Sequence, residues 1–193
     1  MRKLKIMEHI SLDGVIQQSA DGGNFPYSEW TVPYRTPAGR EVVMAEFGAS
    51  FDLLLGRRTY DIWSGFWPKA PSGPMTDGFN GAKKYVATHR PESLAWGPAE
   101  GLGPDLAADV RRIKEQDGPD LVLAGSSTLT STLLEEGLAD EVLLMVYPVL
   151  LGTGKRFFAE GTPARSLELA SSKALASGIV MNAYKGPGPL KTG

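Results

Sequence analysis

The feature of this chain that most constrains its fold is an uninterrupted apolar run that leads through a glycine into a helical pattern. Leu53, Leu54 and Leu55 follow one another with no polar residue between them, as expected of a strand that is covered on both faces. Gly56 ends this strand, and a helix over residues 57–64 is expected directly after it. Because a doubly covered strand belongs in a mainly parallel sheet, the run predicts helices on both faces of that sheet.

The same order of strand, small polar loop and helix recurs along the chain. Residues 121–124 form a second apolar run, and glycine and hydroxyl residues separate it from a helix that ends at Gly137. Ser177 and Gly178 separate two alternating stretches, which predicts a C-terminal antiparallel hairpin. Periodicity also predicts strands over residues 3–11, 83–88, 94–96 and 141–147, and helices over residues 37–50, 75–81 and 105–117.

These elements fit a single domain. A chain of 193 residues can bury one hydrophobic core without dividing, so we expect one domain over residues 1–186. The glycine- and proline-rich end predicts a flexible tail over residues 187–193. The expected fold class is α/β, with a single mixed, mainly parallel sheet, helices on both faces and a C-terminal antiparallel hairpin.

Composition excludes several classes of function. The chain has no cysteine, which excludes disulfides, thiolate metal sites and cysteine nucleophiles. Two histidines do not supply a histidine-rich metal centre, and we expect no bound metal. A net charge of −2 provides no broad basic surface, so we expect neither nucleic acid nor a membrane as a partner. The chain opens without the apolar run of a signal peptide, and we expect a cytoplasmic protein.

Residues suited to binding an anion follow three of the expected strands. Arg57, Arg58 and Thr59 place two positive charges and a hydroxyl on the first turn of a helix, where free N–H groups already favour an anion. Residues 88–90 and 125–128 are the corresponding stretches after two other strands. Because ligands of open α/β sheets bind at the carboxyl ends of strands, this coincidence favours a phosphate-bearing ligand. Taken singly, each stretch is also consistent with an ordinary capped helix and solvated arginines.

An aromatic loop over residues 17–36 precedes the first expected helix. It holds too many aromatic side chains for a disordered linker. Trp30 and Tyr34 are candidates for the wall of a pocket that binds a flat substrate ring. The alternative is that the loop covers the core or forms a subunit contact.

Four motifs in order make the chain recognisable. They are Ser11-Leu-Asp-Gly14, Leu55-Gly-Arg-Arg-Thr-Tyr60, Leu123-Ala-Gly-Ser-Ser-Thr-Leu129 and Tyr147-Pro-Val-Leu-Leu-Gly-Thr-Gly-Lys-Arg-Phe157. With them the chain resembles, over nearly its whole length, the dihydrofolate-reductase-like family that contains the C-terminal reductase domain of riboflavin biosynthesis. The resemblance implies a dihydrofolate-reductase-like fold, NADPH bound across the strand ends, hydride transfer and a homodimer.

The resemblance also assigns site residues by position. His9 and Ile16 fall where the first strand and the following loop line the nicotinamide. The implied cofactor-binding residues are Ile16, Gly56, Arg57, Arg58, Thr59, Thr88, His89, Arg90, Gly125, Ser126, Ser127, Thr128 and Leu129. One position departs from the riboflavin-pathway reductases, which commonly place a glutamate before the glycine loop, where this chain has Ala124.

Reduction by hydride requires a proton as well as a hydride. His9 is a catalytic candidate because it can titrate near neutrality, although a lone histidine in a strand is also typical of a packed core. Asp13 is a second candidate that can orient water, although Asp-Gly is also a turn signal. A third hypothesis is that the cofactor supplies the chemistry and the protein only orients the reactants.

We therefore expect an NADPH-dependent oxidoreductase that transfers a hydride to a small heterocyclic or carbonyl substrate. The expected activity is similar to that of 5-amino-6-(5-phosphoribosylamino)uracil reductase or dihydrofolate reductase. The alternative is a non-catalytic protein that binds a nucleotide or another ligand on the same fold.

Overall fold

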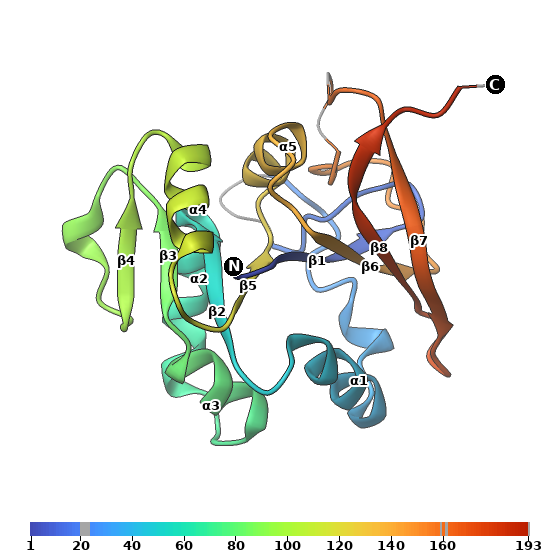
Figure 1. The fold of residues 1–193 in the computed structure, drawn as a ribbon. Coiled ribbons are helices and arrows are strands. Elements are labelled where there is room, and N and C mark those ends of the chain that lie inside the picture. Colours follow the sequence, from blue (N-terminus) through green and yellow to red (C-terminus); the bar gives the residue numbers. More distant parts are fainter. Residues whose placement is uncertain (20–23, 159, 161, 193) are drawn as a thin grey trace.

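The computed structural model describes residues 1–19, 24–158, 160 and 162–192, and an eight-stranded sheet forms its centre. The strand order is β4-β3-β2-β5-β1-β6-β8-β7, with β4 at one end and the β7–β8 hairpin at the other (Figure 1). The strands are β1 (Leu4–Ser11), β2 (Phe51–Gly56), β3 (Lys84–Ala87), β4 (Ala99–Leu102), β5 (Asp120–Ala124), β6 (Glu141–Tyr147), β7 (Arg165–Ala174) and β8 (Val180–Pro189). Strands β1 to β6 pair in parallel, whereas β8 runs antiparallel to β6 and β7. The predicted mixed, mainly parallel sheet with a terminal hairpin is confirmed.

Helices connect the parallel strands. They are α1 (Pro37–Phe47), α2 (Arg57–Phe66), α3 (Pro74–Gly81), α4 (Leu106–Glu115) and α5 (Ser127–Glu135), with short 3-10 turns at Val32–Tyr34, Trp67–Lys69 and Pro91–Ser93. Thr36 caps α1 by accepting a hydrogen bond from the Gly39 N–H at 3.0 Å, and Asp105 caps α4 in the same way. Across the described ranges, no helix has the length and apolar character needed to cross a bilayer.

Strand β2 shows why the sheet has a helical layer on each face. Leu53 and Leu55 pack into one apolar cluster, which includes buried residues of α1, α2 and α3, and Leu54 packs into the other, which includes residues of α4 and α5. All three leucines are 0% exposed. Alternate side chains of one apolar run thus fill two separate cores, which confirms the prediction of helices on both faces.

Two predicted boundaries are wrong. The strand expected over residues 94–96 lies instead at β4, because the Trp96 N–H donates to the Tyr60 hydroxyl at 2.6 Å rather than to a neighbouring strand. Residues 187–189, expected to belong to a flexible tail, are in β8, which continues to Pro189 by pairing with Arg165 of β7.

Charged side chains at the amino edge of the sheet are neutralised within the fold. Arg2 is 4% exposed, forms an ion pair with Asp52 at 2.5 Å and donates to the Pro119 carbonyl. Lys114 similarly donates to Asp140 and to the Leu138 carbonyl. Because buried charges need such partners, this edge serves the stability of the fold.

Glu8 is a buried carboxyl group in the middle of β1. It is 5% exposed and lies on the same strand face as Ile6 and Ile10, which pack beneath α4 and α5. Desolvation raises the pKa of Glu8 to about 8, although its carboxylate accepts a hydrogen bond from the His9 N–H at 2.9 Å. Glu8 is therefore protonated in the folded chain at neutral pH.

Replacing Glu8 by glutamine should stabilise the protein in a pH-dependent manner. The folded state keeps the proton up to about pH 8, whereas an ordinary glutamate loses it near 4.5, so the free energy of unfolding falls as pH rises between these values. At pH 7 we expect Glu8→Gln to raise the free energy of unfolding by about 3 kcal/mol, with the gain vanishing near pH 4.5. Urea unfolding measures this difference, with the exposed Glu41→Gln as the control. A Glu8→Gln variant that is less stable than the native chain at pH 7 would contradict the assignment.

Candidate active site

The carboxyl ends of β2 and β5 are in close contact through two glycines. A Cβ placed on Gly56 would lie 2.9 Å from the Ser126 Oγ, and a Cβ placed on Gly125 would lie 3.1 Å from the Thr59 Oγ1. Both positions therefore need glycine for the two loops to approach this closely. The structure thus brings together the predicted residues at the start of α2 and those at the start of α5.

Arg57 joins this contact to the end of β3. Its guanidinium donates to Ser93 Oγ at 2.6 Å, to the Arg90 carbonyl at 3.1 Å and to Thr88 Oγ1 at 3.4 Å. It also forms an ion pair with Asp61 at 2.9 Å. Arg57 therefore fixes the position of residues 88–93 beside α2, so all three predicted anion-binding stretches lie along one rim of the sheet.

The backbone of this rim is suited to an anion. Among the described residues no side chain caps the first turn of α2, whose N-terminus follows Gly56. At the start of α5, Gly125 has φ 75° and Ser126 has φ 83°. A positive φ is strained for serine, and such strain is concentrated at ligand-binding positions. Two helix N-termini thus meet at the rim with their positive dipole ends, and at α5 the Leu129 N–H donates to the Ser126 Oγ at 3.5 Å.

The other predicted cofactor-binding residues surround these two helix starts. Arg58, His89, Arg90 and Thr128 are exposed, whereas Thr59, Thr88, Ser127 and Leu129 are half-buried. Ile16 packs against the core beneath α4 and α5, as does Leu129.

His9, Trp30, Tyr34 and Tyr147 form a cluster on the opposite face of the sheet, which we name the aromatic cluster. His9 Nδ1 and the Tyr147 hydroxyl share a hydrogen bond of 2.8 Å. Trp30 and Tyr34 contact the Tyr147 ring edge-on, with centroid separations of 5.0 and 5.6 Å. The structure therefore brings together one predicted catalytic residue and both predicted substrate-binding residues.

His9 and Tyr147 are both neutral near pH 7. Desolvation, together with the smaller effect of the positive charge of Arg35, lowers the pKa of His9 to about 4. Desolvation raises the pKa of Tyr147 to about 12. The pair can therefore exchange hydrogen bonds with a polar group without carrying charge.

Tyr147 was not among the residues predicted from the sequence. Its strand was expected, but a tyrosine that ends a strand is common and gives no sign of its partner. The pairing of Ser11 with Tyr147 between β1 and β6 brings it beside His9. The sequence feature that could have pointed to Tyr147 is that His9 and Tyr147 each lie near the carboxyl end of an apolar strand.

Asp13 lies at the same rim, where its carboxylate links the turn after β1 to the loop after β6. Its carboxylate accepts hydrogen bonds from the Ser11 hydroxyl at 2.6 Å and from the N–H groups of Leu151 and Gly152 at 3.2 and 2.7 Å. The Ser11 hydrogen bond is the largest cause that lowers the pKa of Asp13 to about 2. This geometry favours a structural role for Asp13 in the turn over a catalytic role.

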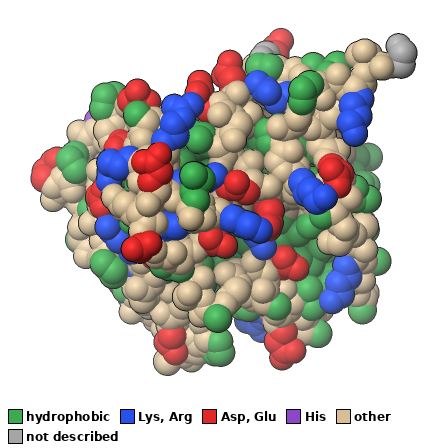
Figure 2. Space-filling model, viewed as in Figure 1, with side chains coloured by type: hydrophobic (Ala, Val, Ile, Leu, Met, Phe, Trp, Pro, Cys, Tyr) green, Lys and Arg blue, Asp and Glu red, His purple; other side chains and the backbone are tan. Residues whose placement is uncertain are grey.

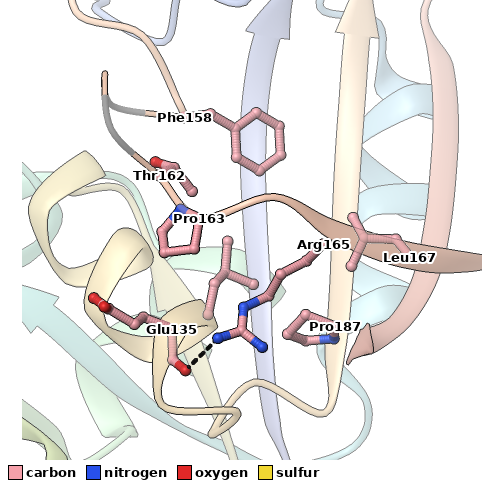
Figure 3. Close-up of a pocket in the computed structure, with 8 residues that line it drawn as sticks. Glu135, Phe158, Thr162, Pro163, Arg165, Leu167 and Pro187 are labelled. Carbon is pink, nitrogen blue, oxygen red and sulfur yellow. Dashed lines mark hydrogen bonds between the residues drawn. The ribbon is translucent and has the colours of Figure 1, made fainter. Parts of the chain in front are cut away.

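Two surface pockets lie away from this rim. One lies between the end of α5 and the β7–β8 hairpin, where Arg165 donates to the Glu135 carbonyl at 2.9 Å (Figure 3). The other lies near Asn80 and Trp96, beside the start of β3. Within the ranges that the structure describes, no group of three or more histidine, aspartate or glutamate side chains could hold a metal ion.

Comparison with known proteins identifies the family. Residues 2–181 match the model of the RibD C-terminal domain. The Bacillus subtilis protein YyaP is 29% identical over 137 residues, which cover 68% of this chain and 72% of YyaP. YwjB of the same organism is 26% identical over 182 residues, 94% of this chain and 97% of YwjB. Both are described as uncharacterized proteins.

Solved structures share the fold. A putative riboflavin biosynthesis protein from Shewanella sp. PV-4 superposes with a TM-score of 0.70 at 18% identity, covering 95% of this chain and 98% of that one. A pyrimidine reductase-like protein from Corynebacterium diphtheriae gives 0.66 at 12% identity, with 96% and 92% covered. The predicted dihydrofolate-reductase-like fold is confirmed, and the chain belongs to the RibD C-terminal domain family.

Proposed function

We propose that this protein is an NADPH-dependent reductase that transfers a hydride to a small heterocyclic or carbonyl substrate. The observation that carries the proposal is the contact of the α2 and α5 N-termini at Gly56 and Ser126, with residues 88–90 held beside them by Arg57. A dinucleotide carries several negative charges along an extended backbone, and this rim offers N–H groups and arginines along its length.

Each part of the rim fits a part of the cofactor. The N–H groups at the starts of α2 and α5 would hold the pyrophosphate, because the two N-termini meet where Gly56 lies against Ser126 and Gly125 lies against Thr59. Arg58 and Arg90, which are exposed, would hold the 2′-phosphate that distinguishes NADPH from NADH. Ile16 and His9 lie near the end of β1, where the nicotinamide would be placed. The bound cofactor supplies the hydride.

The aromatic cluster would hold the substrate. Tyr34 and His9 are half-buried, so Tyr34 would offer part of its ring and His9 a neutral polar atom, while the buried Trp30 and Tyr147 support them from beneath. Such a combination suits a flat ring that carries carbonyl or imine groups.

A third fold relative, from Thermotoga maritima, is a diaminohydroxyphosphoribosylaminopyrimidine deaminase/5-amino-6-(5-phosphoribosylamino)uracil reductase. It has a TM-score of 0.67 at 14% identity, with 96% of this chain and 56% of that chain covered. Its heterocyclic substrate agrees with this proposal. The homodimer that the resemblance implies stays a prediction, which analytical ultracentrifugation tests.

Replacing Arg90 by alanine should weaken NADPH more than NADH. Loss of one charged partner of the 2′-phosphate should raise the Kd for NADPH about 10-fold or more, because a hydrogen bond to a charged group contributes about 1.5–3 kcal/mol. The Kd for NADH should change little. Fluorescence titration measures both constants, with Arg40→Ala on α1 as the control. Equal losses for the two cofactors would contradict the assignment of Arg90.

Replacing Gly56 by alanine should disrupt the rim. The added methyl would lie 2.9 Å from Ser126 Oγ, so the β5–α5 loop must shift. We expect the Kd for NADPH to rise about 10-fold, on the assumption that the shift removes about one charge-assisted hydrogen bond to the pyrophosphate. Gly65→Ala in the same helix is the matched control, because nothing lies within 4 Å of its added methyl. Unchanged NADPH affinity in Gly56→Ala would contradict the role of this contact.

Oxidation of NADPH against a panel of pyrimidines, pterins and small carbonyl compounds tests the reaction itself. Turnover with one of them supports the reductase. Tight NADPH binding without turnover across the panel would instead support the non-catalytic alternative.

A further inference from the structure

We propose that Tyr147 is a positioning residue that holds His9 in the tautomer with hydrogen on Nε2. The imidazole then presents an N–H donor to the carbonyl oxygen or imine nitrogen of the substrate. The catalytic part of this inference rests on the proposed function, whereas the tautomer is a property of the chain alone.

Burial determines the direction of the Tyr147–His9 hydrogen bond. Tyr147 is 1% exposed, and among the described residues His9 is the only hydrogen-bond partner of its hydroxyl. If Nδ1 carried the hydrogen and donated it, the phenol hydrogen would be buried without an acceptor, at a large cost. If the phenol donates to Nδ1, both buried polar atoms are satisfied. A neutral imidazole that accepts at Nδ1 carries its hydrogen on Nε2.

The neighbouring side chains keep the phenol in this position. Trp30 lies at 79° to the Tyr147 ring, Tyr34 lies at 89°, and the Trp30 indole N–H donates to the Gln17 carbonyl at 2.7 Å. A ring that is fixed by two edge-on contacts cannot turn its hydroxyl away from His9 without losing them.

Charge keeps the imidazole neutral. Arg35 belongs to the same region, because its guanidinium donates to Thr31 Oγ1 at 2.8 Å and its positive charge opposes protonation of His9. His9 is half-buried whereas Tyr147 is 1% exposed, so His9 is the more exposed member of the pair.

A donor in this place would assist the proposed reaction. Addition of hydride to a C=O or C=N carbon builds negative charge on the oxygen or nitrogen, and an oriented N–H stabilises that charge. No covalent bond of His9 breaks in this role, and water supplies the proton that completes the reduction.

Nitrogen NMR tests the tautomer without cofactor or substrate. The chain has only two histidines, so ¹⁵N-histidine labelling gives two pairs of ring nitrogen signals, and His89→Asn assigns the pair of His9. At pH 7.5 we expect His9 to be neutral, with hydrogen on Nε2. In Tyr147→Phe, which keeps the ring and removes the hydroxyl, we expect a mixture of both tautomers. Tyr34→Phe, which removes another hydroxyl of the cluster, should leave the His9 signal unchanged.

Kinetics with a substrate from the panel test the positioning role. We expect Tyr147→Phe to lower kcat about 10-fold, the value of one lost neutral hydrogen bond, without changing the Kd for NADPH. Tyr184→Phe, on the opposite face of the sheet, should retain full activity.

Hydrogen on Nδ1 in the native chain, an unchanged His9 signal in Tyr147→Phe or an unchanged kcat in that variant would each overturn the inference. If Tyr147→Phe does not fold, the spectrum of the native chain alone decides the tautomer. Failure of NADPH to bind would refute the proposed function and leave the tautomer result standing.

Discussion

The site depends on one close approach, where the glycine backbone at the end of β2 and in the loop after β5 packs against side chains of the other segment. Gly56 lies against Ser126, and Gly125 lies against Thr59, each without room for a larger residue. Because the two strands pair in parallel, their carboxyl ends meet at one rim, and two helices begin there side by side. The proposed cofactor site, the role of Arg57 and the position of residues 88–93 follow from this contact.

Charged side chains are arranged differently at the amino edge and at the carboxyl rim of the sheet. At the amino edge, Arg2 and Lys114 are buried and paired with Asp52 and Asp140. At the carboxyl rim, the arginines after β2 and β3 include exposed members. Among the described residues no side chain caps α2, whereas Ser126 caps α5 by accepting a hydrogen bond from the Leu129 N–H. On the face shown in Figure 2, basic and acidic side chains alternate rather than forming a surface of one sign. The fold thus buries paired charges at its amino edge and has exposed arginines and two helix N-termini at its carboxyl rim.

Much of this arrangement could be predicted from local patterns. The apolar run at Leu53 to Leu55 predicted a doubly covered strand, and its alternate leucines do fill two cores. The strand expected at residues 94–96 was wrong because a distant side chain, Tyr60, binds the Trp96 backbone, and no local pattern encodes that contact. Family resemblance identified the rim residues, but it could not show that Arg57 is engaged by Asp61 and Ser93. Tyr147 was not predicted for a related reason, because its position beside His9 depends on the register between β1 and β6, which are far apart in sequence.

Hydrogen–deuterium exchange with NADP⁺ tests most directly whether the separate strand ends bind one dinucleotide. The account predicts that saturating NADP⁺ slows amide exchange at residues 56–59, 88–90 and 125–129 together, over the same range of ligand concentration. Slowed exchange confined to the pocket beside Arg165, or no change at these three stretches, would contradict it.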